Sequence, residues 1–246
     1  MDDPEPVSGG AALTPGTFNG SLSLGSPELQ PYRSINADAS IEYYLGSGLI
    51  AIAPFYKHID NPIYTRAYVQ NNVTYETRFY STLGFSQPTN ADAGHIGGVE
   101  LTYQNYFSRL PGVFNGVGVN MNYTLTDSAV TVFGRTESLP FFKQSKHSGT
   151  AALLYEKYGV ASQLSLSFHS PNLGTVGTNV NNDNYPDTYR VVDFKVSAPI
   201  ARGLRGLVEL GNLNNEYRRR YAGSPERRTQ DERYSWNLSV GLDWRY

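Results

Sequence analysis

The sequence predicts an all-β protein: an antiparallel, up-and-down portion of a transmembrane β-barrel with about nine long strands. Apolar and polar residues alternate with a period of two in successive segments. Several segments reach about ten residues or more, the length that crosses a bilayer, whereas strands of soluble sheets usually have five or six. Aromatic residues gather near the segment ends, as they do at the two membrane interfaces.

The alternation starts at residue 35 and recurs to the end of the chain. In 35–43 and 117–126 it is unbroken, whereas in 48–60 the two faces cannot be assigned from the sequence. No helical period of useful length occurs. The nine predicted strands are 35–43, 48–60, 99–104, 117–126, 148–156, 163–169, 192–198, 204–212 and 236–246.

The last segment has the clearest two-faced pattern. Every second residue is apolar, and the residues between are polar or small, so one face is expected to meet lipid. Outer-membrane barrels commonly end in an aromatic residue, in a strand that the barrel assembly machinery reads. The residues expected to face lipid and to carry this signal are Trp236, Leu238, Val240, Leu242, Trp244 and Tyr246.

Short and long connections alternate strictly between these strands. This rhythm predicts a meander with short periplasmic turns at one end and long extracellular loops at the other. Within the first long connection, 64–69 and 73–80 flank Gln70-Asn71-Asn72, which predicts a hairpin that turns at this triplet. The short connections are 45–48, 109–115, 157–159 and 199–203, and the long ones are 60–95, 127–146, 170–187 and 214–233.

The chain divides into a lead-in and a barrel portion. Residues 1–33 are rich in Pro and Gly and are expected to be loop or disordered, and 34–246 form the C-terminal portion of the barrel. The start has neither a basic region nor an apolar core, so we expect no secretory signal. No run approaches 18 apolar residues, so no transmembrane helix is expected.

Composition argues against several classes of function. The chain has no Cys, which excludes disulfides and thiolate chemistry, and its net charge of −2 gives no sign of nucleic-acid binding. Its four His residues are scattered without metal-ligand spacing, and no G-x-S-x-G motif occurs. We therefore expect no enzyme activity, no metal site and no cofactor.

Several stretches, taken in order, resemble one family, the TonB-dependent outer-membrane receptors. PELQPY within 25–45 is similar to the family's N-P-x-L-K-P-E loop, and LGNLNNEY within 207–227 to its N-L-x-N-x-x-Y motif. The stretches 48–64, 90–128 and 144–159 resemble the strands between them. Each motif is degenerate alone, but the ordered series is specific and covers about residues 25–246.

The resemblance implies a 22-stranded barrel with an N-terminal plug and a TonB box, of which this chain would supply the last nine strands. Signal peptide, plug and TonB box are expected to be absent, as in a gene fragment or after a mispredicted start. The implied function is energised uptake of a scarce nutrient, of the siderophore, cobalamin or carbohydrate class, across the bacterial outer membrane. TonB would be reached only through the missing N-terminal part.

Two alternatives remain open at this point. One is a passive porin-like or other small outer-membrane barrel, and the other is a soluble β-sandwich binding module. The segment 217–233 is the most charged, and its arginines suit phosphate or carboxylate groups of a ligand or of lipopolysaccharide. Internal ion pairs and loop packing are the other interpretations. The candidate contacts are Arg218, Arg219, Arg220, Arg227, Arg228, Tyr64, Tyr68, Tyr75 and Tyr80.

Overall fold

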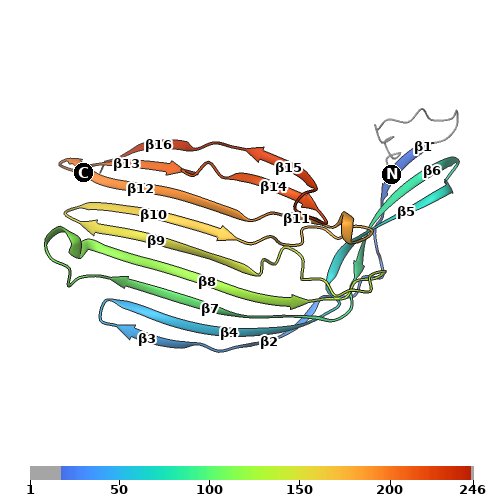
Figure 1. The fold of residues 1–246 in the computed structure, drawn as a ribbon, viewed down its shortest axis with the longest axis horizontal. Coiled ribbons are helices and arrows are strands. Elements are labelled where there is room, and N and C mark those ends of the chain that lie inside the picture. Colours follow the sequence, from blue (N-terminus) through green and yellow to red (C-terminus); the bar gives the residue numbers. More distant parts are fainter. Residues whose placement is uncertain (1–17, 245–246) are drawn as a thin grey trace.

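The structure, a computed structural model, describes residues 18–244. It consists of one large antiparallel sheet and two small three-stranded sheets at one end of it (Figure 1). The expectation of loop for residues 1–17 and the lipid-facing assignment of Tyr246 lie outside the described residues. The strands of the large sheet are β2 (Arg33–Asp38), β3 (Ile41–Leu45), β4 (Gly48–Asp60), β7 (Gly94–Tyr106), β8 (Val117–Ala129), β9 (His147–Lys157), β10 (Val160–His169), β12 (Tyr189–Ala201), β13 (Leu204–Gly211) and β16 (Asn237–Trp244).

The large sheet has the predicted up-and-down order, from β16 through β13, β12, β10, β9, β8, β7 and β4 to β2 and β3. Strands β2 and β3 together cover the predicted strand 35–43, which is interrupted at Ala39 and Ser40, and both pair with β4. All nine predicted strands are therefore present. Within residues 18–244 the outer strands, β16 at one edge and β2/β3 at the other, do not pair with each other, so the barrel is not closed.

The pairing register joins the apolar residues of neighbouring strands into one continuous face. Residues directly opposite each other lie on the same side of a sheet. One such row runs across six strands through Ile50, Tyr103, Met121, Ala151, Leu166 and Val192. A row on the other side of the sheet, three positions along each strand, consists of Ala53, Glu100, Thr124, Ser148 and His169.

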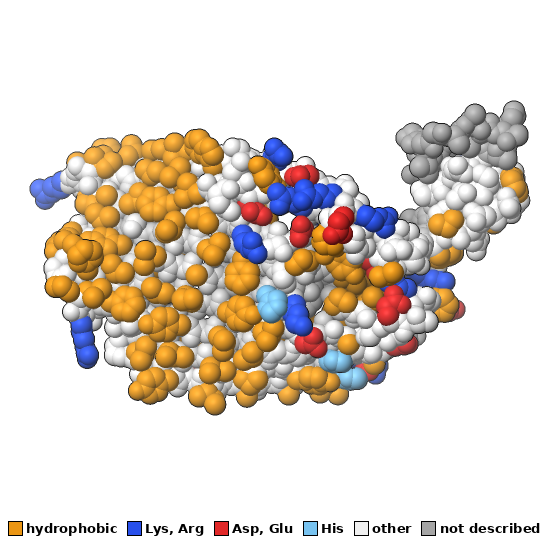
Figure 2. All heavy atoms as spheres, viewed as in Figure 1, with side chains coloured by type: hydrophobic (Ala, Val, Ile, Leu, Met, Phe, Trp, Pro, Cys, Tyr) orange, Lys and Arg blue, Asp and Glu red, His pale blue; other side chains and the backbone are white. Residues whose placement is uncertain are grey.

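This register assigns the faces of 48–60, which the sequence left open. Ile50 and Ile52 lie on the apolar face, and Ala51 and Ala53 lie on the polar one. Figure 2 shows hydrophobic side chains spread over the whole sheet on one side of the molecule. Leu242 and Val240 at one edge are 70 % and 72 % exposed, and many further large apolar side chains of the sheet are exposed with them. Soluble monomers rarely expose large contiguous apolar patches.

The short turns gather at one end of the sheet and the long loops at the other (Figure 1). The turn between β7 and β8 contains a short 3-10 helix, η1 (Gly112–Gly116). The two small sheets lie at the loop end. One consists of β1 (Phe18–Ser23), β5 (Ile63–Tyr75) and β6 (Arg78–Asn90). The other consists of β11 (Asn184–Pro186), β14 (Tyr217–Ala222) and β15 (Arg228–Arg233), and a second 3-10 helix, η2 (Val180–Asn182), precedes β11. Among residues 18–244, no helix is long and apolar enough to cross a membrane.

The hairpin β5–β6 turns later than predicted. The chain reverses at Glu76-Thr77, where Glu76 has a φ of 52°, so the predicted turn at Gln70-Asn71-Asn72 is wrong. Asn72 does adopt a left-handed φ of 54°, but the pairing register continues through it. Asn tolerates this conformation readily, so the sequence signal was a local twist and not a reversal.

Part of the stretch assigned to loop at the start of the chain is a strand. β1 pairs in parallel with β6, and Leu22 packs with Tyr80, Leu83 and Phe85 in a small buried cluster. Its six residues carry little signal of their own, and the pairing partner lies about sixty residues away. The strand conformation of β1 therefore depends on its long-range pairing with β6 and not on its local sequence pattern.

Candidate functional site

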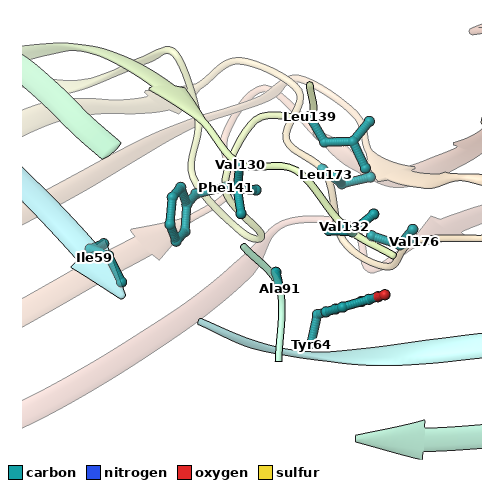
Figure 3. Packing of buried hydrophobic residues seen from close by; sticks show 9 residues of the cluster. All are labelled: Ile59, Tyr64, Ala91, Val130, Val132, Leu139, Phe141, Leu173 and Val176. Carbon is teal, nitrogen blue, oxygen red and sulfur yellow. The ribbon is translucent and has the colours of Figure 1, made fainter. Parts of the chain in front are cut away.

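The loop end of the sheet is the candidate site, because its loops pack into one body. A cluster of buried apolar side chains joins the base of the hairpin β5–β6 to the loops that follow β8 and β10 (Figure 3). The side chains point toward one another from four segments of the chain. They are Ile59, Tyr64, Ala91, Val130, Val132, Leu139, Phe141, Leu173 and Val176.

A buried ion pair holds the same loops together. Arg135 donates from Nη1 and Nη2 to the two carboxylate oxygens of Asp183, at 2.9 and 2.7 Å. The side chains of Arg135 and Asp183 are 6 % and 0 % exposed. Hydrogen bonding to Asp183 raises the pKa of Arg135 further above its usual value. Such paired, two-pronged contacts are the strong form of the Arg–carboxylate interaction.

Asp183 also ties in two further backbone segments. Its Oδ1 accepts from the amide of Gly177 at 2.8 Å, and its carbonyl accepts from the amide of Gly223 at 2.9 Å. Gly223 has a φ of +69°, and a Cβ there would meet the backbone of Asn181 at 2.7 Å, so a glycine is required. The connection β14–β15 is therefore fixed against the loop between β10 and β12.

The predicted arginine segment folds as the hairpin β14–β15. Because side chains alternate between the two faces of a strand, neighbouring arginines of β14 point to opposite faces. Arg218 and Arg220 lie on one face, opposite Glu232 and Gln230, and line a hollow of about 270 Å³. The guanidinium carbon of Arg218 lies 5.8 Å from the ring centre of Tyr189. His169, Pro186, Asp187 and Arg219 complete the lining.

Arg219 mainly belongs to the opposite face. Its guanidinium carbon lies 5.0 Å from the ring centre of Tyr217, and its Nε is 4.0 Å from Asp231. That Nε is buried and has no hydrogen-bond partner among residues 18–244. Arg228 also approaches Asp231, at 3.7 Å, and Arg227 donates to the carbonyl of Asn181 at 2.6 Å.

The glutamate in the Arg218 hollow is held charged. Glu232 accepts hydrogen bonds from the hydroxyl of Tyr234 and the amide of Gln230. These two hydrogen bonds lower the pKa of Glu232 below its usual value, and the bond from Tyr234 has the larger effect. The positive charges of Arg218 and Arg220 lower it further. The hollow thus combines the guanidinium groups of three arginines with two carboxylates, of which that of Glu232 already accepts from other donors.

The four predicted tyrosines lie at different depths. Tyr64 and Tyr80 are 5 % and 3 % exposed and belong to the two buried clusters. Tyr68 stacks on Phe85 with ring centres 4.9 Å apart, and Tyr75 is half-buried in the hairpin β5–β6. As ligand contacts, these residues and the arginines remain predictions.

The histidines do not form a site together. His147 shares a 2.6 Å hydrogen bond with Tyr123, and His169 stacks on Tyr189. Within residues 18–244, no group of three His, Cys, Asp or Glu side chains could hold a metal ion.

A comparison with family models gives the decisive match. Residues 6–215 match the model described as "TonB dependent receptor-like, beta-barrel". The chain belongs to the TonB-dependent receptor family. No curated protein sequence matches it.

Solved structures of similar fold include a ferric citrate transporter, an iron transporter and a siderophore receptor. The ferric citrate transporter FecA has a TM-score of 0.60 at 13 % sequence identity, and the match covers 85 % of this chain and 31 % of FecA. FrpB, the iron transporter of Neisseria meningitidis, has a TM-score of 0.58 at 13 % sequence identity, and the match covers 90 % of this chain and 31 % of FrpB. The siderophore receptor PirA of Acinetobacter baumannii has a TM-score of 0.57 at 12 % sequence identity, and the match covers 90 % of this chain and 33 % of PirA. This chain therefore spans about a third of their length.

Sequence reasoning identified the arginine segment but missed the ion pair beneath it. Asp183 lies in the run Asn-Asn-Asp-Asn, which has the composition of an ordinary loop. Arg135 is 48 residues earlier, between Gly134 and Thr136, and nothing in its neighbours marks it. Only the fold brings these two residues together.

Proposed function

We propose that the chain is the C-terminal barrel portion, residues 34–246, of an outer-membrane receptor that takes up a scarce nutrient with energy from TonB. The carrying observation is the open nine-stranded sheet with an apolar and a polar face, in a member of the TonB-dependent receptor family. An apolar face of this size suits lipid, and a polar face suits a wet lumen. The unpaired edge strands suit closure by further strands of a larger barrel.

We propose an iron–siderophore complex as the ligand class, because FecA, FrpB and PirA are described as carriers or receptors of ferric citrate, iron and siderophores. Arg218 and Arg220 would contact anionic groups of that ligand from the loop end. Arginine forks suit carboxylate and phosphate, and Tyr189 supplies an aromatic wall to the same hollow.

The remaining partners follow from the same proposal. The apolar face would meet outer-membrane lipid, the loop arginines Arg227 and Arg228 would meet lipopolysaccharide phosphates, and β16 would be read by the barrel assembly machinery. TonB would bind a part of the receptor outside this chain. The protein would hold, select and pass the ligand, without enzyme chemistry.

Deleting the gene in its native bacterium tests the uptake function. Under iron limitation we expect loss of growth on at least one of a panel of ferric siderophores, with cobalamin and carbohydrate supplies as comparison arms. Deleting tonB should reproduce the same loss, because uptake requires transmitted energy. Growth that falls with the receptor gene but not with tonB would instead indicate a passive porin.

A further inference from the structure

A second hollow at the loop end differs from the one lined by Arg218. It lies between strand β5 and the loops that follow β8 and β10, and its volume is about 330 Å³. Its walls combine aromatic, aliphatic and cationic side chains. Those that matter here are Tyr64, Arg66, Tyr68, Phe133 and Val176.

Arg66 is held in this hollow by aromatic rings. Its guanidinium carbon lies 4.0 Å from the ring centre of Phe133 and 4.7 Å from that of Tyr68. These contacts favour its charge but use none of its five N–H donors. Arg66 forms neither an ion pair nor a side-chain hydrogen bond with any residue between 18 and 244.

The neighbouring arginine is already neutralised. Arg135 also lines the hollow, but its guanidinium pairs with Asp183 and with Glu137, the latter at 2.6 Å. Arg66 is therefore the cation of this hollow that lacks a counter-charge. Rings that fix the direction of an arginine reduce the entropy lost when it binds a planar acid.

A second donor in the same wall also lacks an acceptor. Tyr64 is 5 % exposed, and its hydroxyl donates to no acceptor within the described part of the chain, while the backbone amide of Phe133 approaches its oxygen. Burial raises the pKa of Tyr64, so the hydroxyl keeps its proton at neutral pH. Leaving a buried hydroxyl without an acceptor carries a desolvation cost. An oxygen acceptor that reached this hydroxyl would remove the cost.

We propose that this hollow is a subsite for an aromatic carboxylate group of the transported ligand, a proposal that rests on the uptake function above. The carboxylate would bind the free N–H edge of Arg66, since a planar guanidinium matches a carboxylate with two parallel hydrogen bonds. The ring would pack on Phe133, which is 63 % exposed, and on Val176. Tyr64 supplies the second donor.

Benzoate is the probe, and benzamide, which has the same shape without the charge, is its control. The whole receptor that carries this chain is purified in detergent and titrated by calorimetry. We expect benzoate to bind at least tenfold more tightly than benzamide. Arg66→Gln should weaken benzoate binding at least tenfold, and Phe133→Leu should weaken it severalfold while keeping the charge.

Arg202→Gln is the matched control, because it removes the same charge at the short turn between β12 and β13. It should leave benzoate binding unchanged. Equal binding of benzoate and benzamide, unchanged binding in Arg66→Gln, or no benzoate binding up to about 10 mM would each overturn the proposal. A receptor that supports TonB-dependent growth yet fails this titration would refute the subsite and leave the uptake function standing.

Discussion

At the scale of single residues, the ion pair between Arg135 and Asp183 explains how three loop segments keep one arrangement. Removing one partner of a buried pair leaves an uncompensated charge, which typically costs about 3–5 kcal/mol. We therefore predict that Asp183→Asn loosens the loops after β8 and β10 by roughly that amount. Hydrogen exchange of the amides in 130–146 and 170–183 measures it.

Glu137→Gln is a suitable control for this prediction. Glu137 also contacts Arg135, but its side chain is 44 % exposed, so its loss should change exchange little. Equal exchange in Asp183→Asn and the unmodified receptor would show that the buried pair does not hold the loops.

The hairpin β14–β15 should respond to acid through Glu232. Because its pKa is lowered in the folded hairpin, its contribution is present above the ordinary value of 4.5 and is lost as pH falls through the lowered pKa. A nitroxide attached through Pro225→Cys, in the hairpin turn, should become more mobile as the pH falls through the lowered pKa of Glu232. Glu232→Gln should remove this transition, and a transition that persists in Glu232→Gln would assign it to another group.

The residue scale also shows what sequence alone can predict. Alternation correctly indicated which residues of β7, β8 and β10 share a face, because a strand has a period of two regardless of its partners. It could not indicate that Tyr64 and Tyr80 are buried while Arg218 lines a hollow. Those outcomes depend on contacts between loops far apart in the sequence.

At the scale of elements, β16 gives the sharpest contrast between the two faces. Val240 lies opposite Val208 on the apolar face, and Ser239 lies opposite Glu209 on the polar face. We predict that Val240→Arg destabilises the barrel by about 2–4 kcal/mol, the cost of arginine facing mid-bilayer lipid. Urea unfolding of the receptor in lipid vesicles measures the loss.

Ser239→Arg is the matched control, since it places the same side chain one position away on the polar face. It should cost far less, with Glu209 opposite to receive the charge. Equal losses for the two variants would mean that the faces of β16 do not meet different solvents.

Strands of the large sheet were predictable because each carries its own alternation, and most of them have eight to thirteen residues. The hairpin β5–β6 was also predictable apart from its turn, whereas β1, β11, β14 and β15 were not, because they have three to six residues each. Their stability comes from partners in other loops, such as Tyr221 stacked on Tyr185 with ring centres 5.2 Å apart. Charge and length made 214–233 look like an open loop.

At the scale of the whole molecule, the two unpaired edges of the nine-stranded sheet require an explanation. Unpaired backbone groups facing lipid cost several kcal/mol each, so a stable barrel needs strands beyond those described. We predict that the polypeptide in native outer membranes has an intact mass several times the 27.2 kDa of this chain. Mass spectrometry of the protein recovered with an antibody to the loop 170–183 measures it, and a mass near 27 kDa would contradict the account.

The central claim is that one face of this sheet meets lipid and the other meets water. Because the chain contains no Cys, single cysteines for nitroxide labels can be placed at successive positions of β8, from 119 to 124. In receptor-containing vesicles, we predict that labels at 119, 121 and 123 are accessible to membrane-dissolved oxygen, and those at 120, 122 and 124 to a water-soluble nickel complex. Equal access of the nickel complex to both sets would contradict the account, because the apolar face would then be in water.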